Sequence, residues 1–289
     1  MEVKFEKNKL FNLSKLNLKM FNVQKKIGIS LILFSFMICI IIEKLKYNSL
    51  AYNLNVNFWD GVFKVLCHPI LFLGLYFPFV VVMATVFDMK DKYGKFIMIR
   101  SNEKYLWIVS KVISNFIISL LFTSTLFVLI FIFSYINFTF ENSWSRVIFN
   151  KDALKLVNVL YMNNFVFSFT PIEACVISFF EIYICTCIII NLNDIVTNYI
   201  SKNYISNLII SMYFLINIVS FSYKLSDGKY NLLSYIGLDT MSLIWKHNFI
   251  NCQYYNLTVF QSLFISLLVL TVLVFVNLIL NRKLVVDCD

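Results

Sequence analysis

The sequence contains few charged residues and few helix-breaking residues for its length. Only 14% of its 289 residues are charged, and it holds three prolines, six glycines and two histidines. A soluble domain carries about 25% charged residues, because it needs polar surface to stay dissolved. The shortage of charge therefore excludes an ordinary soluble domain and indicates that lipid is the solvent for much of the chain.

The chain also lacks the motifs by which soluble enzymes bind nucleotides or catalytic zinc. It contains no G-x-x-x-x-G-K-[ST], no G-x-G-x-x-G and no H-E-x-x-H. Each of these motifs supplies a phosphate cradle or a pair of metal ligands. We therefore expect no enzymatic activity and no cofactor or metal bound by this chain itself.

The positions of the histidines and cysteines indicate structural residues rather than metal ligands or disulfides. His68 and His247 lie at or beyond the outer ends of apolar runs, without a His or Cys neighbour at metal-ligand spacing. We expect both to be interfacial polar residues. The seven cysteines are an odd number and lie mostly inside apolar runs, so we expect small packing residues rather than a disulfide framework.

Long apolar runs make up most of the chain, which is 60% hydrophobic and 18% aromatic. A helix needs about 20 predominantly apolar residues to cross the hydrocarbon core. The sequence therefore predicts an all-α membrane protein with six transmembrane helices, at about residues 27–42, 66–87, 107–137, 172–192, 204–221 and 257–280.

Lysine and arginine are distributed unevenly between the segments that join these runs. If the N-terminus is inside, the inner segments hold sixteen of these residues and the outer segments hold nine. Cytoplasmic loops carry the excess of positive charge in membrane proteins. The pattern predicts that both termini are inside, and it accounts for the net charge of +9 without a nucleic-acid partner.

Residues 1–26 form a basic segment ahead of the first apolar run. Apolar residues recur among its lysines, at Leu10, Leu13, Leu16, Met20 and Phe21. A basic amphipathic helix of this kind lies in the membrane interface, where each well-placed lysine attracts anionic lipid by about 1 kcal/mol. We therefore divide the chain into an interfacial helix on the cytoplasmic side (1–26) and a six-span transmembrane domain (27–289).

The segment Asp88–Lys111 interrupts the apolar runs with six basic and three acidic residues. Within it Tyr93, Phe96 and Ile97 are spaced to share one face of a helix. We predict a short amphipathic helix at the inner membrane surface. A solvated loop that follows the positive-inside rule is the alternative.

Glu181 falls near the middle of the predicted fourth span, whereas Glu173 lies at its outer edge. An ionised side chain at the bilayer centre costs at least ~2.5–3.5 kcal/mol. Glu181 should therefore face protein or a water-filled cavity, or be protonated. It is either a polar group in a translocation path or one side of a helix–helix hydrogen bond.

The overall layout and the segment after the second run resemble the permease subunits of ABC-2 type transporters. In the small permeases of Gram-positive bacteria, an acidic residue ends the second span, a basic and apolar helix follows, and a pattern with Arg, Trp and Lys opens the third span. The corresponding residues here are Asp88, Phe96–Ile99, Arg100-Ser101, Trp107 and Lys111.

The resemblance implies a division of labour between subunits. An ATP-binding cassette ATPase would bind ATP and Mg²⁺, and it would dock on a coupling helix in this chain. The residues implied for that contact are Asp88, Asp91, Phe96, Arg100, Glu103 and Lys104. Two permease subunits, identical or related, would pair in the cytoplasmic membrane of a bacterium. Segment 222–256 corresponds to the place where this family has short re-entrant helices before the last span.

The expected cargo is hydrophobic or peptide-like, because a path lined by Phe, Ile and Leu does not suit small ions. The resemblance links such permeases with the export of peptide antibiotics or bacteriocins, or with immunity to them. Two alternatives stay open. One is a gradient-driven transporter or channel, which requires several ionisable residues inside the membrane, and the other is a non-transporting membrane subunit of a complex.

Overall fold

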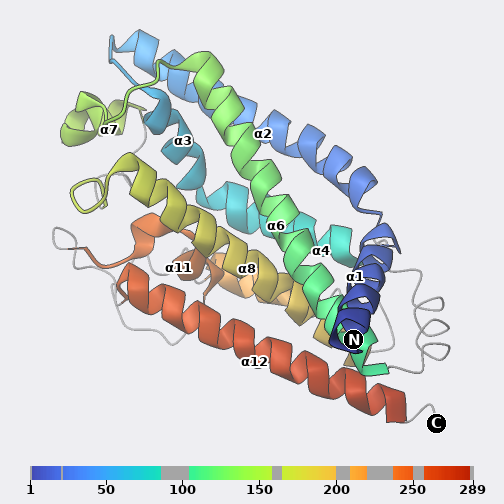
Figure 1. Cartoon of the computed structure of the whole chain (residues 1–289). Coiled ribbons are helices and arrows are strands. Elements are labelled where there is room, and N and C mark those ends of the chain that lie inside the picture. Colours follow the sequence, from blue (N-terminus) through green and yellow to red (C-terminus); the bar gives the residue numbers. More distant parts are fainter. Residues whose placement is uncertain are drawn as a thin grey trace.

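The computed structural model describes residues 2–20, 22–85, 104–157, 165–199, 209–219, 237–249 and 257–286. These residues fold almost entirely into helices (Figure 1). The long helices are α1 (Glu2–Met20), α2 (Val23–Ala51), α6 (Lys104–Asn137), α8 (Pro171–Tyr199) and α12 (Val259–Val286). The shorter ones are α3 (Phe58–Leu66), η1 (Ile70–Tyr76), α4 (Phe77–Thr85), η2 (Arg146–Phe149), α7 (Lys151–Val157), α11 (Leu238–Ser242) and η4 (Ile244–Lys246).

Within the described residues, four helices are long and apolar enough to cross a membrane: Gln24–Ala51, Leu106–Asn137, Pro171–Thr197 and Val259–Ile279. A bent pair, Phe58–Leu66 with Ile70–Ala84, would make a fifth span. The predicted fifth run is represented by a shorter apolar helix, Ile209–Val219. The all-α membrane class is therefore confirmed with four to five candidate spans, whereas the six spans and their orientation stay predictions.

Helix α2 extends beyond the predicted first span at both ends. It begins after Asn22, whose left-handed backbone (φ 55°, ψ 45°) separates it from α1, a conformation that asparagine tolerates better than most residues. At the other end the helix continues past Lys44 to Ala51, because Leu45 and Ser49 still pack into the protein. The apolar run marks the part of a helix that lipid can cover, not where the helix ends.

The structure breaks the helix near the start of the predicted second span, 66–87. The structure has α3, then a break at Cys67–Pro69, then η1 and α4, with a bend of 54°. Pro69 has no backbone N–H and therefore cannot continue an α-helical ladder, and the chain resumes as a π-helix. Asn57 and Asp60 cap the start of α3 reciprocally in a capping box, a motif that stabilises a helix start.

Helix α8 lies at the centre of the bundle and packs against α4, α6, α11 and α12. In its most apolar stretch 67% of the residues are buried in the protein, against 22% in α12 and 33% in α2. Tyr76 joins η1 to the two central helices, because its hydroxyl lies 3.2 Å from Thr123 Oγ1 on α6 and 3.1 Å from Thr186 Oγ1 on α8. Helices α2 and α12 therefore form the outer faces.

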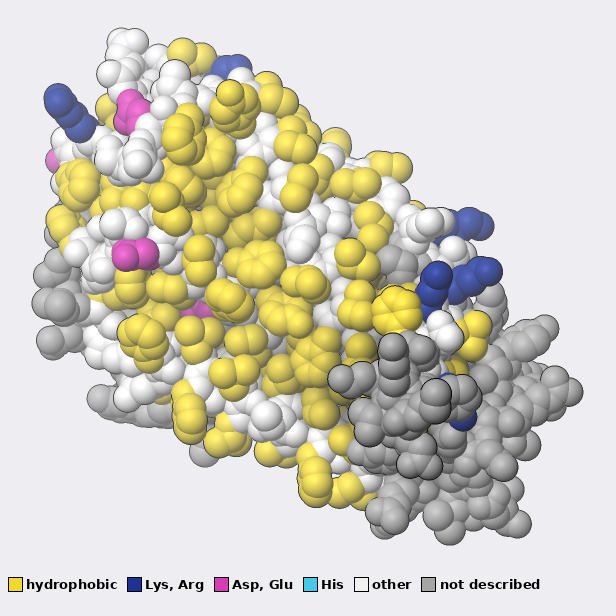
Figure 2. All heavy atoms as spheres, in the orientation of Figure 1, with side chains coloured by type: hydrophobic (Ala, Val, Ile, Leu, Met, Phe, Trp, Pro, Cys, Tyr) yellow, Lys and Arg dark blue, Asp and Glu magenta, His cyan; other side chains and the backbone are white. Residues whose placement is uncertain are grey.

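The outer faces expose apolar side chains. Figure 2 shows hydrophobic side chains spread over most of the visible middle, with the Lys and Arg side chains toward the two ends. On α2 Ile32 and Phe36 are exposed, and on α12 Phe260, Phe264 and Phe275 are exposed. Soluble proteins rarely expose an apolar area of this size, and a lipid environment would cover it.

Helix α1 packs on the first part of α6 through its polar face. Ser14 and Asn17 are buried, whereas Phe11 is 70% exposed. Asn17 Nδ2 donates a hydrogen bond of 3.0 Å to Ser110 Oγ, and Ser114 Oγ donates one of 3.4 Å to the carbonyl of Ser14. The helical character of this segment agrees with its amphipathic pattern, and its place at a membrane interface stays a prediction.

Candidate functional site

Residues 237–249, which we call the short-helix segment, are folded into the interior of the protein. They comprise α11 and η4, and every residue from Gly237 to His247 is buried. Figure 1 shows α11 between α8 and α12. Such deep burial is unusual for a connection between helices, because loops normally run over the surface.

Hydrogen bonds attach the short-helix segment to several other parts of the chain. The Leu238 N–H donates to Asn217 Oδ1 in helix Ile209–Val219 at 2.8 Å. Trp245 Nε1 donates to the Cys67 carbonyl, in the bend after α3, at 3.2 Å. Ser262 Oγ on α12 donates to the Thr240 carbonyl at 3.4 Å. The segment is therefore positioned by contacts with residues far apart in the sequence.

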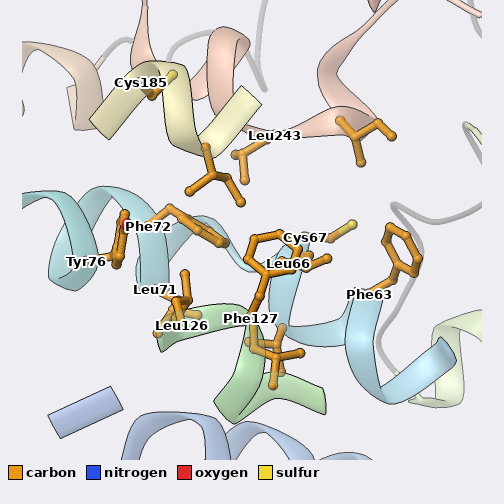
Figure 3. Close-up of a cluster of buried hydrophobic side chains, with 14 of the residues drawn as sticks. Phe63, Leu66, Cys67, Leu71, Phe72, Tyr76, Leu126, Phe127, Cys185 and Leu243 are labelled. Carbon is orange, nitrogen blue, oxygen red and sulfur yellow. The ribbon is translucent and has the colours of Figure 1, made fainter. Parts of the chain in front are cut away.

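Apolar packing fills the space around these hydrogen bonds. Figure 3 shows Leu243 of the segment facing the helix that carries Phe72, with Cys67 and Leu66 close to it. Phe72 and Leu243 are completely buried, and Leu66 is 1% exposed. In a bundle surrounded by lipid, such side chains hold helices together by close van der Waals packing, so the apolar contacts add to the attachment by hydrogen bonds.

The segment carries a buried ion pair of its own. Lys246 Nζ lies 2.7 Å from Asp239 Oδ2, and the two side chains are 1% and 0% exposed. Lys246 Nζ also lies 5.5 Å from the ring centre of Trp245. A buried charge needs a partner to offset its loss of hydration, and this pair closes α11 and η4 into one compact unit.

A second acid–base pair joins the short-helix segment to α8. His247 Nε2 lies 3.3 Å from Glu181 Oε1, and both side chains are 0% exposed. The angles at this contact do not make a hydrogen bond, and within the described residues neither Glu181 oxygen nor His247 Nε2 has another hydrogen-bond partner. His247 Nδ1 lies 2.9 Å from the Ile244 carbonyl. The short-helix segment and its contact with α8 thus bring four buried ionisable side chains together: Glu181, Asp239, Lys246 and His247.

This arrangement both confirms and corrects what the sequence predicted. Glu181 faces protein, as its depth in an apolar helix required. His247 is not interfacial but fully buried against Glu181, because the segment that carries it folds inward. His68 is half-buried in the bend, where its Nδ1 accepts a hydrogen bond of 3.3 Å from the Leu71 N–H.

Sequence reasoning missed the short-helix segment as the partner of Glu181. Its signal was present in the stretch LDTMSLIWKHNF (residues 238–249), where three ionisable residues lie among large apolar ones. Large apolar residues are mostly buried in folded proteins, so a surface loop rarely contains so many of them. An apolar composition with isolated charges is typical of a segment that is buried with its charges paired.

A second group of buried polar side chains, which we call the polar junction, joins α6, α8 and α12. Asn115 Nδ2 donates a hydrogen bond of 2.6 Å to Asp194 Oδ2 and lies 3.5 Å from Asn191 Oδ1. Asn277 Nδ2 on α12 lies 3.5 Å from the same Asn191 oxygen. Lys111 Nζ lies 3.6 Å from Asp194 Oδ1. The junction lies on the same part of α6 as the contacts with α1.

Most residues of the predicted coupling segment lie outside the described residues. This applies to Asp88, Asp91, Phe96, Arg100 and Glu103, and Lys104 is described only as the first residue of α6. Trp107 and Lys111, which belong to the same resemblance, are described. Trp107 is buried, and Lys111 pairs with Asp194.

The described residues contain no cluster of three or more His, Cys, Asp or Glu side chains that could hold a metal ion. The five cysteines described are free: Cys39, Cys67, Cys175, Cys185 and Cys187.

Comparison with known proteins assigns a family but no activity. Neither the curated proteins nor the solved structures gave a match. A family model described as a protein of unknown function, DUF2705, matches residues 27–284. The chain therefore belongs to the DUF2705 family.

Proposed function

We propose that this chain is the membrane subunit of an ABC-2 type transporter in the cytoplasmic membrane of a bacterium. It moves a hydrophobic or peptide-like compound, and a separate ATP-binding cassette subunit hydrolyses ATP. The family match itself carries no transport assignment. The proposal therefore rests on the arrangement of helices together with the resemblance in the sequence.

The short-helix segment is the observation that carries this proposal. Permeases of the ABC-2 type have short re-entrant helices just before their last span. Here α11 and η4 are short, buried and directly ahead of α12, the last long helix of the described residues. A similarity in arrangement is an analogy of fold and needs an experimental test of function.

The position of α1 supports the proposed coupling to an ATPase. Its hydrogen bonds reach Ser110 and Ser114, in the first part of α6. The proposed coupling residues, from Asp88 to Lys104, immediately precede that part of the chain. In this proposal both termini and the coupling segment face the cytoplasm, where an ATPase can push on α1 and α6 together.

Movement driven by the ATPase would shift the packing of α6 and α8 against each other. Packed helices change between discrete arrangements rather than deforming continuously. The polar junction links α6, α8 and α12, so it would carry a shift of α6 to the centre of the bundle. Glu181 is fully buried against His247. In this proposal it therefore belongs to a helix contact that changes during transport, and it does not line an open translocation path.

The partners in this proposal are an ATPase, membrane lipid and a second permease subunit, identical or related. Co-purification tests the first partner. A tagged chain should retain an ATPase with nucleotide-binding motifs, and Asp91→Lys or Glu103→Lys should lower ATP-dependent transport in reconstituted vesicles while leaving membrane insertion intact. Asp152→Lys is the matched control, because Asp152 is exposed on α7. Equal transport by all three variants would contradict the coupling assignment.

A gradient-driven transporter is the second candidate, and one observation favours it. Four ionisable side chains lie close together in the interior where the short-helix segment meets α8, namely Glu181, Asp239, Lys246 and His247, and secondary transporters place such groups at their coupling sites. Transport by the purified chain in vesicles without nucleotide would support this candidate. ATP-dependent transport that needs the ATPase would support the first.

A further inference from the structure

The contact between Glu181 and His247 fixes which nitrogen of the histidine carries hydrogen. His247 Nδ1 lies 2.9 Å from the Ile244 carbonyl oxygen. A carbonyl oxygen only accepts hydrogen bonds, so Nδ1 is the protonated nitrogen. In a neutral histidine the other nitrogen, Nε2, then carries a lone pair, and it lies 3.3 Å from Glu181 Oε1.

The number of protons shared by this pair follows from the geometry. With no proton, a carboxylate would face a lone pair in the protein interior, and both groups would lack a hydrogen-bond donor. With two protons, a neutral acid would face an imidazolium, and one positive charge would be buried without compensation. With one proton the pair is neutral overall, either as acid with imidazole or as carboxylate with imidazolium.

Among the described residues no hydrogen-bond donor reaches either oxygen of Glu181. Asp239 and Lys246 of the same segment pair with each other at 2.7 Å. The other titratable side chains nearby are Cys67 from the end of α3, Cys185 from α8 and Tyr213 from helix Ile209–Val219. All three are neutral when protonated. From α12, the Ser262 hydroxyl donates a hydrogen bond to the segment, and this side chain carries no charge.

We propose that Glu181 and His247 form a proton-binding site that holds one exchangeable proton between Oε1 and Nε2 and thereby fastens the short-helix segment to α8. This pair is a polar side-chain contact between the segment and α8. Removing the proton leaves a carboxylate against a lone pair, so the segment loosens from α8 as pH rises. The inference depends on geometry alone and not on transport.

The proton count can be measured directly on the full-length chain in lipid nanodiscs. Infrared spectra in H₂O and D₂O report whether Glu181 is protonated, with Glu181→Gln identifying its band. Nitrogen NMR of labelled histidine reports on Nε2, with His247→Gln identifying its signal. Near neutral pH we expect either a protonated carboxyl with a bare Nε2, or a carboxylate with a protonated Nε2. A carboxylate with a bare Nε2, or protons on both groups, would overturn the proposal.

The fastening role is tested by hydrogen–deuterium exchange of peptides from residues 237–249. After correction for the intrinsic rate, exchange in the wild type should rise by about tenfold when the site loses its proton, as expected for the loss of one hydrogen bond to a charged group. Glu181→Gln offers a permanent N–H donor to Nε2, so its exchange should not depend on pH. Glu173→Gln is the matched control, because Glu173 lies exposed at the start of the same helix. Identical pH dependence of exchange in the wild type and in Glu181→Gln would contradict the fastening role. If a variant does not fold, the infrared spectrum of the wild type still tests the proton count.

Discussion

Asn115 and Asp194 form the shortest polar contact in the polar junction, with 2.6 Å between Nδ2 and Oδ2. Asn115 lies on α6 and Asp194 on α8, and both side chains are buried. A hydrogen bond to a buried carboxylate is stronger than one between neutral groups, because the charge loses its hydration and needs the donor. This contact therefore holds the two central helices in register.

Loss of the Asn115 donor should destabilise the protein. In Asn115→Ala, Asp194 keeps Lys111 at 3.6 Å but loses its closest partner, and we expect a loss of about 1–3 kcal/mol. Thermal unfolding in detergent, followed by circular dichroism, measures the change. Thr271→Ala is a suitable control, because its hydroxyl bonds only within its own helix on an exposed face, and it should stay within about 0.5 kcal/mol of the wild type.

The ion pair between Asp239 and Lys246 should respond differently to single and double substitution. Lys246→Met leaves a buried carboxylate without its closest partner, so we expect destabilisation of about 3–5 kcal/mol. Lys246→Met combined with Asp239→Asn removes both charges and should recover much of that loss. Urea or thermal unfolding of the four proteins completes the cycle. A double variant as unstable as the single one would contradict the charge argument.

Gly61 is expected to tolerate no larger residue, because α3 approaches the end of α6 closely there. A Cβ at this position would lie 2.8 Å from Phe138 Cδ2 and 3.0 Å from Ser134 Oγ. Gly61→Ala should therefore destabilise the protein by about 1–3 kcal/mol through overpacking. At Gly28 nothing lies within 4 Å, so Gly28→Ala should be neutral or slightly stabilising, because alanine favours a helix. Similar melting temperatures for the two variants would contradict the close packing of α3 on α6.

The proposed orientation can be tested with two exposed positions at opposite ends of the bundle. Figure 1 shows α1 and α7 at opposite ends, and Lys15 and Asp152 are exposed on them. In a chain whose own cysteines are replaced, a membrane-impermeant maleimide should label Asp152→Cys in intact cells. It should label Lys15→Cys only after the cells are opened. The reverse pattern would contradict the placement of α1 and the proposed coupling segment in the cytoplasm.

The long helices were the most predictable part of the fold. The third, fourth and sixth predicted runs correspond to α6, α8 and α12 within a few residues, because a long apolar run specifies a helix whatever surrounds it. The break at Cys67–Pro69 was not predicted, although His68 and Pro69 interrupt the apolar composition there. There the backbone geometry of Pro69 outweighs the hydrophobic pattern.

The candidate site was predictable only in part. The depth of Glu181 in an apolar helix required a buried partner, and the sequence indicated that requirement. Its partner, His247, comes from a distant part of the chain, and only the folded arrangement brings the two together. The partner of a buried charge is set by tertiary packing, which the periodicity of a single sequence does not encode.

The bend after α3 has a consequence for how the protein is assembled. Because the helix breaks there, the Cys67 carbonyl is left to accept the Trp245 N–H, and the short-helix segment also needs Asn217 and Ser262 as partners. Ser262 follows the segment in the chain, so its contact with Thr240 can form only after the start of the last helix has been synthesised. The packing of the short-helix segment is thus completed late in biosynthesis. A chain that ends before α12 would leave this segment without its contact with Ser262.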